Sequence, residues 1–225
     1  MIIQVYAFTD AAQAREAALM GVDHIGFVAG DYGLVPAELS FEKARALRLA
    51  LPDTAAAVAL TMSTDIDEIM RMALYVRPQF VHISTDMEDV PLPAMQILRE
   101  RLRPEGIRLM KAISVTDEGT VEAARYYASA SDMLLLDTKS EEIMGIGVSG
   151  KTHDWNISRQ IVETCGVPVI LAGGLSPQNV AAGMHMARPY GVDSNTHTNL
   201  PGDLVAKDMG RIRAFVQSVR IAEKE

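Results

Sequence analysis

The amino-acid sequence predicts an α/β protein that folds as a single closed (βα)8 barrel of the TIM type. Short, dense apolar runs alternate along the chain with stretches in which apolar residues recur at a helical period. Eight strand-then-helix units of about 28 residues fit within the 225 residues. No long polar linker separates the units, so we expect one domain over residues 1–225, with a doubly wound open sheet as the main alternative.

Eight apolar runs are the expected strands, because each is short, dense and bounded by polar or turn residues. In chain order they are IIQVYA (2–7), HIGFVA (24–29), AAAVALT (55–61), FVHIS (80–84), IRLMKAI (107–113), DMLLLD (132–137), PVILAG (168–173) and YGVD (190–193).

The segments between these runs have helical patterns. Thr64 is an expected helix cap, and Ser176 followed by Pro177 is typical of an N-cap and the first helical residue. We interpret the basic segments 99–103 and 211–220 as solvated helix faces, since their arginines alternate with apolar residues. The last helix is amphipathic, with apolar residues at spacings of three and four: Val205, Met209, Ile212, Val216 and Val219.

Composition excludes several classes of protein. The chain is 48% hydrophobic with a net charge of -8, which is ordinary for a globular protein. Its 21 Lys and Arg residues against 29 Asp and Glu argue against a nucleic-acid partner. The one cysteine, Cys165, excludes a disulfide framework and a cysteine-rich metal site. No apolar stretch has the length of a membrane span or a secretion signal, so we expect a cytoplasmic protein with no membrane partner.

Functional residues of a barrel lie where strands end, at its C-terminal face. The run PVILAGGLSPQNV passes from a buried strand through Gly173 and Gly174 toward a helix, an arrangement that can hold an anion. Ser194 and Asn195 follow the eighth strand, where barrels often place the second half of a phosphate site. We therefore expect a phosphorylated small-molecule substrate; the alternative is that the two glycines only form a turn.

Two charged residues stand out in apolar strands. Asp137 ends the run MLLLD, and a poorly hydrated carboxyl there suits a general acid at neutral pH; the alternative is an aspartate that only caps a loop. Lys111 interrupts the run RLMKAI, and we expect it to point into the barrel. There it would pair with Asp137, contact the substrate phosphate or form an imine, as in a lyase; a structural ion pair is the alternative.

The histidines give weaker signals. His82, His153 and His197 lie near strand ends, but neither HxH nor HExxH spacing is present, so the sequence predicts no metal site. His82 and His197 remain candidate proton-transfer groups. The glycine-rich segment 144–155 is either a flexible loop over the site or a plain long connection.

Several blocks of the sequence match a known family. They are GVDHIGFV (21–28), MKAI (110–113), DMLLLDTK (132–139), SGKTHDW (149–155), PVILAGGLSPQNV (168–180) and RPYGVD (188–193). On these blocks the chain resembles the phosphoribosylanthranilate isomerase family over almost its full length. The resemblance implies a (βα)8 barrel that converts an aminoaldose phosphate into an aminoketose phosphate, an Amadori rearrangement.

The resemblance also implies roles for particular residues. The family's general acid falls on Asp137, its phosphate-binding glycines on Gly173 and Gly174, and its strand-eight phosphate loop near Ser194 and Asn195.

The family's general base does not carry over. Its opening Lys-Ile-Cys-Gly, with the catalytic cysteine, is here Gln4-Val5-Tyr6-Ala7. A tyrosine has an ordinary pKa of about 10 and is a poor substitute for a thiolate base at neutral pH. The arginine that follows the second strand in the family is also missing, because the segment 30–38 contains no cation.

We therefore expect an isomerase of the aldose-ketose class that acts on a phosphorylated sugar or sugar-derived compound. Asp137 would be the acid, His82, Asp10 or Tyr6, in that order, the replacement base, and Lys111 a stabiliser of charge. Such a reaction needs no cofactor, and we expect a monomer or homodimer. The alternatives are the family reaction itself with a recruited base, and a non-catalytic barrel that binds phosphate ligands.

Overall fold

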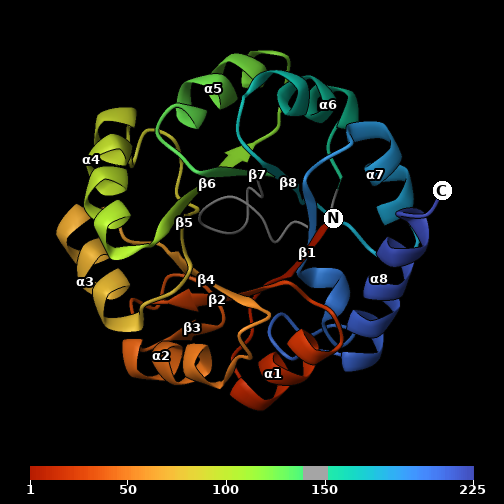
Figure 1. Cartoon of the computed structure of the whole chain (residues 1–225), viewed down its shortest axis with the longest axis horizontal. Helices are drawn as coiled ribbons and strands as arrows, with labels where there is room; N and C mark the ends of the chain where they lie inside the picture. The colour runs from red at the N-terminus through yellow and green to blue at the C-terminus, as the bar shows by residue number, and fades with distance from the viewer. Residues whose placement is uncertain (139–151) are drawn as a thin grey trace.

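The computed structural model describes residues 1–138 and 152–225 and has the predicted (βα)8 architecture (Figure 1). Eight parallel strands form the barrel, and β1 pairs with both β2 and β9, which closes it. They are β1 (Ile2–Val5), β2 (His24–Ala29), β4 (Ala56–Thr61), β5 (Phe80–Ile83), β6 (Arg108–Ser114), β7 (Met133–Asp137), β8 (Val169–Leu171) and β9 (Gly191–Ser194). Each predicted strand is thereby confirmed.

A two-residue strand that the sequence pattern did not predict, β3 (Glu38–Leu39), pairs with the end of β2. It lies at the C-terminal end of the barrel and returns the chain from the loop over residues 30–37. This short pairing fixes where that loop leaves and rejoins the barrel.

Helices form the outer ring in Figure 1. They are α1 (Ala11–Leu19), α2 (Phe41–Ala50), α3 (Ile66–Val76), α4 (Leu92–Leu102), α5 (Gly119–Ala128), α6 (Trp155–Thr164), α7 (Val180–Ala187) and α8 (Met209–Ala222), with short 3-10 turns at Arg103–Glu105 and Thr196–Thr198. None of the helices in the described ranges has the length and apolar character needed to cross a membrane.

Three helix boundaries differ from the predictions. Helix α3 is capped by Asp65, not Thr64, because the Asp65 carboxylate accepts the backbone N–H groups of residues 67 and 68. Ser176 and Pro177 form a turn, and α7 begins at Val180 after Asn179. Val205 precedes α8, whose first turn is capped by Asp208.

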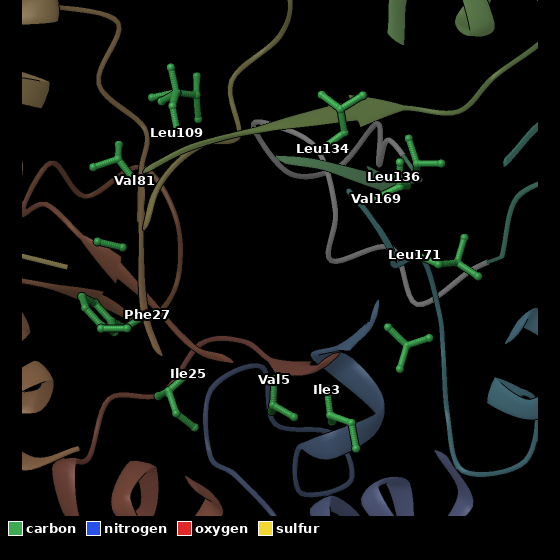
Figure 2. Close-up of a cluster of buried hydrophobic side chains, with 14 of the residues drawn as sticks. Ile3, Val5, Ile25, Phe27, Val81, Leu109, Leu134, Leu136, Val169 and Leu171 are labelled. Atoms are coloured by element: carbon green, nitrogen blue, oxygen red, sulfur yellow. The ribbon is translucent and has the colours of Figure 1, made fainter. Parts of the chain in front are cut away.

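Apolar side chains fill both sides of the strand wall, because successive residues of a strand point to opposite faces. Outside it, Ile3, Val5, Leu109, Leu134 and Leu136 point toward the helices (Figure 2). Inside it, a second cluster contains Val58, Phe80, Met110, Met133 and Ile170, each at most 3% exposed. This inner cluster fills the barrel interior, so that polar side chains with access to a ligand gather at the C-terminal mouth.

Candidate active site

A cavity opens at the C-terminal ends of the strands and has two dissimilar walls. Its apolar wall comes mainly from β2, β4 and the loops that follow them: Val28, Val35, Pro36, Leu60, Met62 and Leu204. Its polar residues are Tyr6, His82, Ser84, Asp137, Asp193 and Asn195. Within residues 1–138 and 152–225, no Lys or Arg lines this cavity, as expected from the cation-free segment 30–38.

A smaller chamber lies beside it, between the ends of β8 and β9. Gly173, Gly174, Ser194 and Asn195, the four predicted phosphate-binding residues, all line this chamber. Gly173 and Gly174 have φ angles of 79° and 62°, in the left-handed region that favours glycine. A Cβ at Gly173 would lie only 2.8 Å from Thr138 Oγ1, so this close approach also requires glycine.

Three residues line both chambers: Asp137, Asp193 and Asn195. Asp137 ends β7, whereas Asp193 and Asn195 lie at and just beyond the end of β9. The two carboxyl groups therefore mark the junction at which the apolar-walled cavity meets the glycine-lined chamber.

Asp137 is a weak acid in this environment. Burial raises the pKa of its carboxyl group to about 7, although the backbone N–H of Thr138, which donates to Oδ1 over 2.6 Å, opposes the rise. A carboxyl group with this pKa holds a proton for much of the time near neutral pH and can donate it.

Asp193 is 5% exposed and lies beside Gln4 of β1. Burial, and then the negative charge of Asp137, raise the pKa of Asp193 to about 8, whereas the side chains of Gln4 and Lys207 oppose this rise. Its Oδ1 atom is buried and has no hydrogen-bond partner in the described part of the chain. Asp193 is not among the predicted site residues, although it ends the run YGVD just as Asp137 ends MLLLD.

Lys207 is a second functional candidate that the sequence analysis missed. It is 4% exposed, and its Nζ donates to Asn195 Oδ1 over 3.0 Å and to Asn199 Oδ1 over 2.6 Å. Burial lowers the pKa of Lys207 to about 7, and the Asp193 charge opposes this shift. Lys207 follows no strand in the sequence, so no local pattern could have selected it.

Tyr6 and His82 form a buried pair, with 2.6 Å between Tyr6 Oη and His82 Nδ1. Burial, and then the Asp193 charge, raise the pKa of Tyr6, so its phenol stays protonated and can donate a hydrogen bond to Nδ1. His82 Nε2 is buried and has no hydrogen-bond partner in the described part of the chain, and in the tautomer that accepts from Tyr6 it carries the ring hydrogen. Burial, and then the Lys111 charge, lower the pKa of His82 to about 3, which makes the ring a weak base.

Lys111 does not point into the barrel, so that prediction is wrong. Met110 and Ala112 occupy the inward face of β6, and the strict alternation of a strand turns Lys111 outward. Its Nζ donates to the backbone carbonyl of Thr85 and lies 5.9 Å from the centre of the Tyr127 ring. It therefore reaches neither the substrate cavity nor Asp137, and imine formation at this amine has no geometric support.

The remaining candidates take different places. Asp10 caps α1, where its carboxylate accepts the backbone N–H of Gln13 over 2.8 Å, and it does not line the cavity. His197 lines the small chamber, and His153 lies against Gly173. Most of the glycine-rich segment 144–155 is outside the described residues. No three His, Cys, Asp or Glu side chains gather as metal ligands within residues 1–138 and 152–225.

Comparison with known proteins gives a consistent result along the chain. The family described as "N-(5'phosphoribosyl)anthranilate (PRA) isomerase" matches residues 4–218. The N-(5'-phosphoribosyl)anthranilate isomerase of Methanocella arvoryzae is 33% identical over 221 residues, which cover 98% of this chain and 99% of that protein. The enzyme of the same name from Haloferax volcanii is 31% identical, covering 98% and 93%. Phosphoribosyl anthranilate isomerase from Thermotoga maritima superimposes with a TM-score of 0.78 at 27% identity, covering 98% and 99%.

Proposed function

The chain belongs to the N-(5'-phosphoribosyl)anthranilate isomerase family, and from this premise we propose that it converts a phosphorylated aminoaldose into the corresponding aminoketose by acid–base proton transfer. N-(5'-phosphoribosyl)anthranilate, the compound in the names of its relatives, is the first substrate to test. The observation that carries this proposal is the position of Asp137 at the junction of the two chambers.

The two chambers give the substrate one orientation. Its phosphate enters the chamber of Gly173 and Gly174, where loop backbone can approach an anion closely and which Ser194 and Asn195 also line. Its nitrogen substituent packs against the apolar wall that includes Val28, and the sugar carbons span the junction.

The reaction begins with opening of the sugar ring. Protonated Asp137 donates to the ring oxygen while the bond from this oxygen to C1 breaks, and the nitrogen lone pair forms a C1=N iminium. The raised pKa of Asp137, caused by burial, supports this role. His82 also lines this cavity, and while its Nδ1 accepts from Tyr6 its Nε2–H is available as a hydrogen-bond donor to the sugar.

Two measurements on the wild type and the Asp137→Asn variant test this proposal. We expect the wild type to convert N-(5'-phosphoribosyl)anthranilate, and Asp137→Asn to lower kcat by about 100-fold or more. Binding of inorganic phosphate, measured by calorimetry, should stay within about threefold, since the glycine chamber is retained. A wild type that binds phosphate but converts neither this compound nor any phosphosugar in a broad panel would instead be the non-catalytic barrel.

A further inference from the structure

We propose that Asp193 is the general base that replaces the missing family cysteine, so that two carboxyl groups, Asp137 and Asp193, carry the acid–base chemistry. This inference rests on the proposed function and identifies the group that the isomerisation still requires.

The position of Asp193 is the first argument. It is one of three described residues that line both the apolar-walled cavity and the glycine-lined chamber; the other two are Asp137 and Asn195. A substrate whose phosphate lies in one chamber and whose nitrogen substituent lies in the other must place C1 and C2 between them. Asp193 lies at that junction with a buried Oδ1 that no described residue hydrogen-bonds.

The other candidate bases are less suitable. Tyr6 stays protonated because burial raises its pKa, and its Oη is hydrogen-bonded to His82 Nδ1. Burial, and then the Lys111 charge, lower the pKa of His82 to about 3, so its ring is a weak base. Asp10 caps α1 outside the cavity, and Lys111 points away from it.

Burial, and then the charge of Asp137, favour the protonated form of Asp193, whereas Lys207 and Gln4 favour its carboxylate. Four side chains influence Asp193: Asp137, Tyr6, Gln4 and Lys207. The repulsion from ionised Asp137, the smaller of the two causes that raise the pKa of Asp193, disappears when Asp137 is protonated, so the reactive form is the one in which Asp137 holds the proton that the pair shares. Two interacting carboxyls that share one proton supply an acid and a base at the same time.

The proton transfers balance without any added reactant. After Asp137 has opened the ring, Asp193 removes the C2 proton, and the C2–H electrons form a C1=C2 bond while the iminium nitrogen regains its electron pair. Asp193 then returns its proton to C1. The C2 hydroxyl loses its proton to Asp137 as the ketone forms, which restores both carboxyl groups.

Kinetics of Asp193→Asn and His82→Gln distinguish this base from its main competitor. We expect Asp193→Asn to lower kcat for N-(5'-phosphoribosyl)anthranilate by about 100-fold or more with KM within about threefold. His82→Gln should lose less, because the amide still offers an N–H donor. Asp193→Glu should recover part of kcat, since it restores a carboxylate that can take a proton.

Two controls separate catalysis from stability. Asp23→Asn makes the same chemical change at the opposite end of the barrel, where Asp23 accepts the backbone N–H of Ile3, and should retain wild-type kcat. Inorganic phosphate should bind Asp193→Asn as it binds the wild type, which would show that the variant is folded around the glycine chamber.

The outcomes are distinguishable. The inference fails, and the proposed function stands, if Asp193→Asn keeps kcat within about tenfold of an active wild type, or if only its KM rises. It also fails if the kcat loss comes with loss of phosphate binding. An inactive wild type overturns both the proposed function and this inference.

Discussion

Tyr6, which the resemblance places at the family's catalytic cysteine, packs against a glycine on the neighbouring strand that makes room for it. A Cβ at Gly26 of β2 would lie 2.5 Å from Cδ1 of the Tyr6 ring, well inside any normal contact. The two residues are therefore coupled: the aromatic side chain on β1 requires the absence of a side chain on β2.

This coupling predicts the effect of Gly26→Ala. The added methyl group should push the Tyr6 ring from its place and lower the free energy of unfolding by roughly 1–3 kcal/mol, as other overpacked cores do. Urea denaturation would measure the change. In a Tyr6→Val background the ring is absent, so Gly26→Ala should lower the free energy of unfolding by much less. Equal costs in the two backgrounds would show that the ring and the glycine are independent.

Asp193 should also have a pH-dependent effect on stability. Burial, and then the charge of Asp137, raise the pKa of Asp193 to about 8 in the folded protein, compared with about 3.9 for an unperturbed aspartate. Between these values the folded state binds a proton that the unfolded state has lost, so this group makes the protein less stable as pH rises. The amide introduced by Asp193→Asn does not titrate and lacks this effect.

The prediction concerns the difference between wild type and Asp193→Asn. The free energy of unfolding of the wild type should fall relative to that of the variant as pH increases from about 4.5 to about 7. Denaturant titrations at several pH values measure both curves. This window lies below most of the titration of Lys207, whose pKa burial lowers to about 7. Parallel curves would mean that the pKa of Asp193 is not raised in the fold.

At the scale of elements, the loop between β2 and β3 depends on one carboxylate. Glu38 Oε2 accepts the backbone N–H groups of Tyr32 and Gly33, at 2.8 and 2.7 Å. Its Oε1 accepts those of Leu34 and Val35, at 3.1 and 3.2 Å. The loop therefore folds around its own anion and presents Val35 to the apolar wall of the cavity.

Glu38→Gln should open this loop. An amide has only one acceptor oxygen, so its NH2 group would face two backbone N–H donors at a cost of about 1–3 kcal/mol. We expect KM for N-(5'-phosphoribosyl)anthranilate to rise about fivefold or more with little change in kcat, and proteolysis between residues 30 and 38 to accelerate. Glu42→Gln, the same change on exposed α2, is the control. An unchanged KM would mean that the loop does not contribute to binding.

The sequence predicts the positions of the strands more accurately than the face of a strand on which a single side chain lies. All eight barrel strands follow from dense apolar runs, because burial on both faces leaves an unmistakable local pattern. The same density hides which face a residue occupies. The pattern predicts that Lys111 points into the barrel, whereas Met110 and Ala112 occupy the inward face of β6. β3 was missed because two residues are too few to form a pattern.

The candidate site was predicted in part for a related reason. Gly173, Gly174, Ser194 and Asn195 gather in one chamber, as expected from their positions after strands seven and eight. Asp193 and Lys207 gain their properties from neighbours distant in sequence, which no local window reveals. The lack of a GxxxxGK[ST] phosphate loop is not a valid argument against an open sheet, because GIGVSGKT at 145–152 fits that pattern; the pairing of β1 with both β2 and β9 establishes the closed barrel.

At the scale of the whole molecule, the barrel separates two kinds of recognition. The apolar wall comes largely from β2, β4 and their loops, whereas the glycine chamber comes from β8, β9 and theirs. These two groups of strands meet only through β1 and through the ring of strands between them. The relative position of the two half-sites therefore depends on closure of the barrel, which takes place at β1.

Arg220 of α8 reinforces this closure at the opposite end of the barrel. Its guanidinium donates to the backbone carbonyl of Met1 over 2.9 Å and to Asp23 Oδ2 over 3.1 Å. Asp23, just before β2, in turn accepts the backbone N–H of Ile3 in β1 over 2.8 Å. The last helix is thereby connected to the first two strands, where the ring of strands closes.

Arg220→Ala should therefore weaken the whole fold without affecting the chemistry. We expect the free energy of unfolding to fall by about 1–2 kcal/mol, since the arginine is partly exposed and its bonds are partly replaced by water. Urea denaturation of Arg220→Ala, Asp23→Asn and the double variant would give a coupling energy of about 0.5 kcal/mol or more if the two residues act together. The kcat/KM of Arg220→Ala, measured below its unfolding midpoint, should stay within about twofold of wild type. Additive losses in the double variant would mean that closure does not depend on this contact, and a large loss of kcat/KM would mean that the two ends of the barrel are coupled.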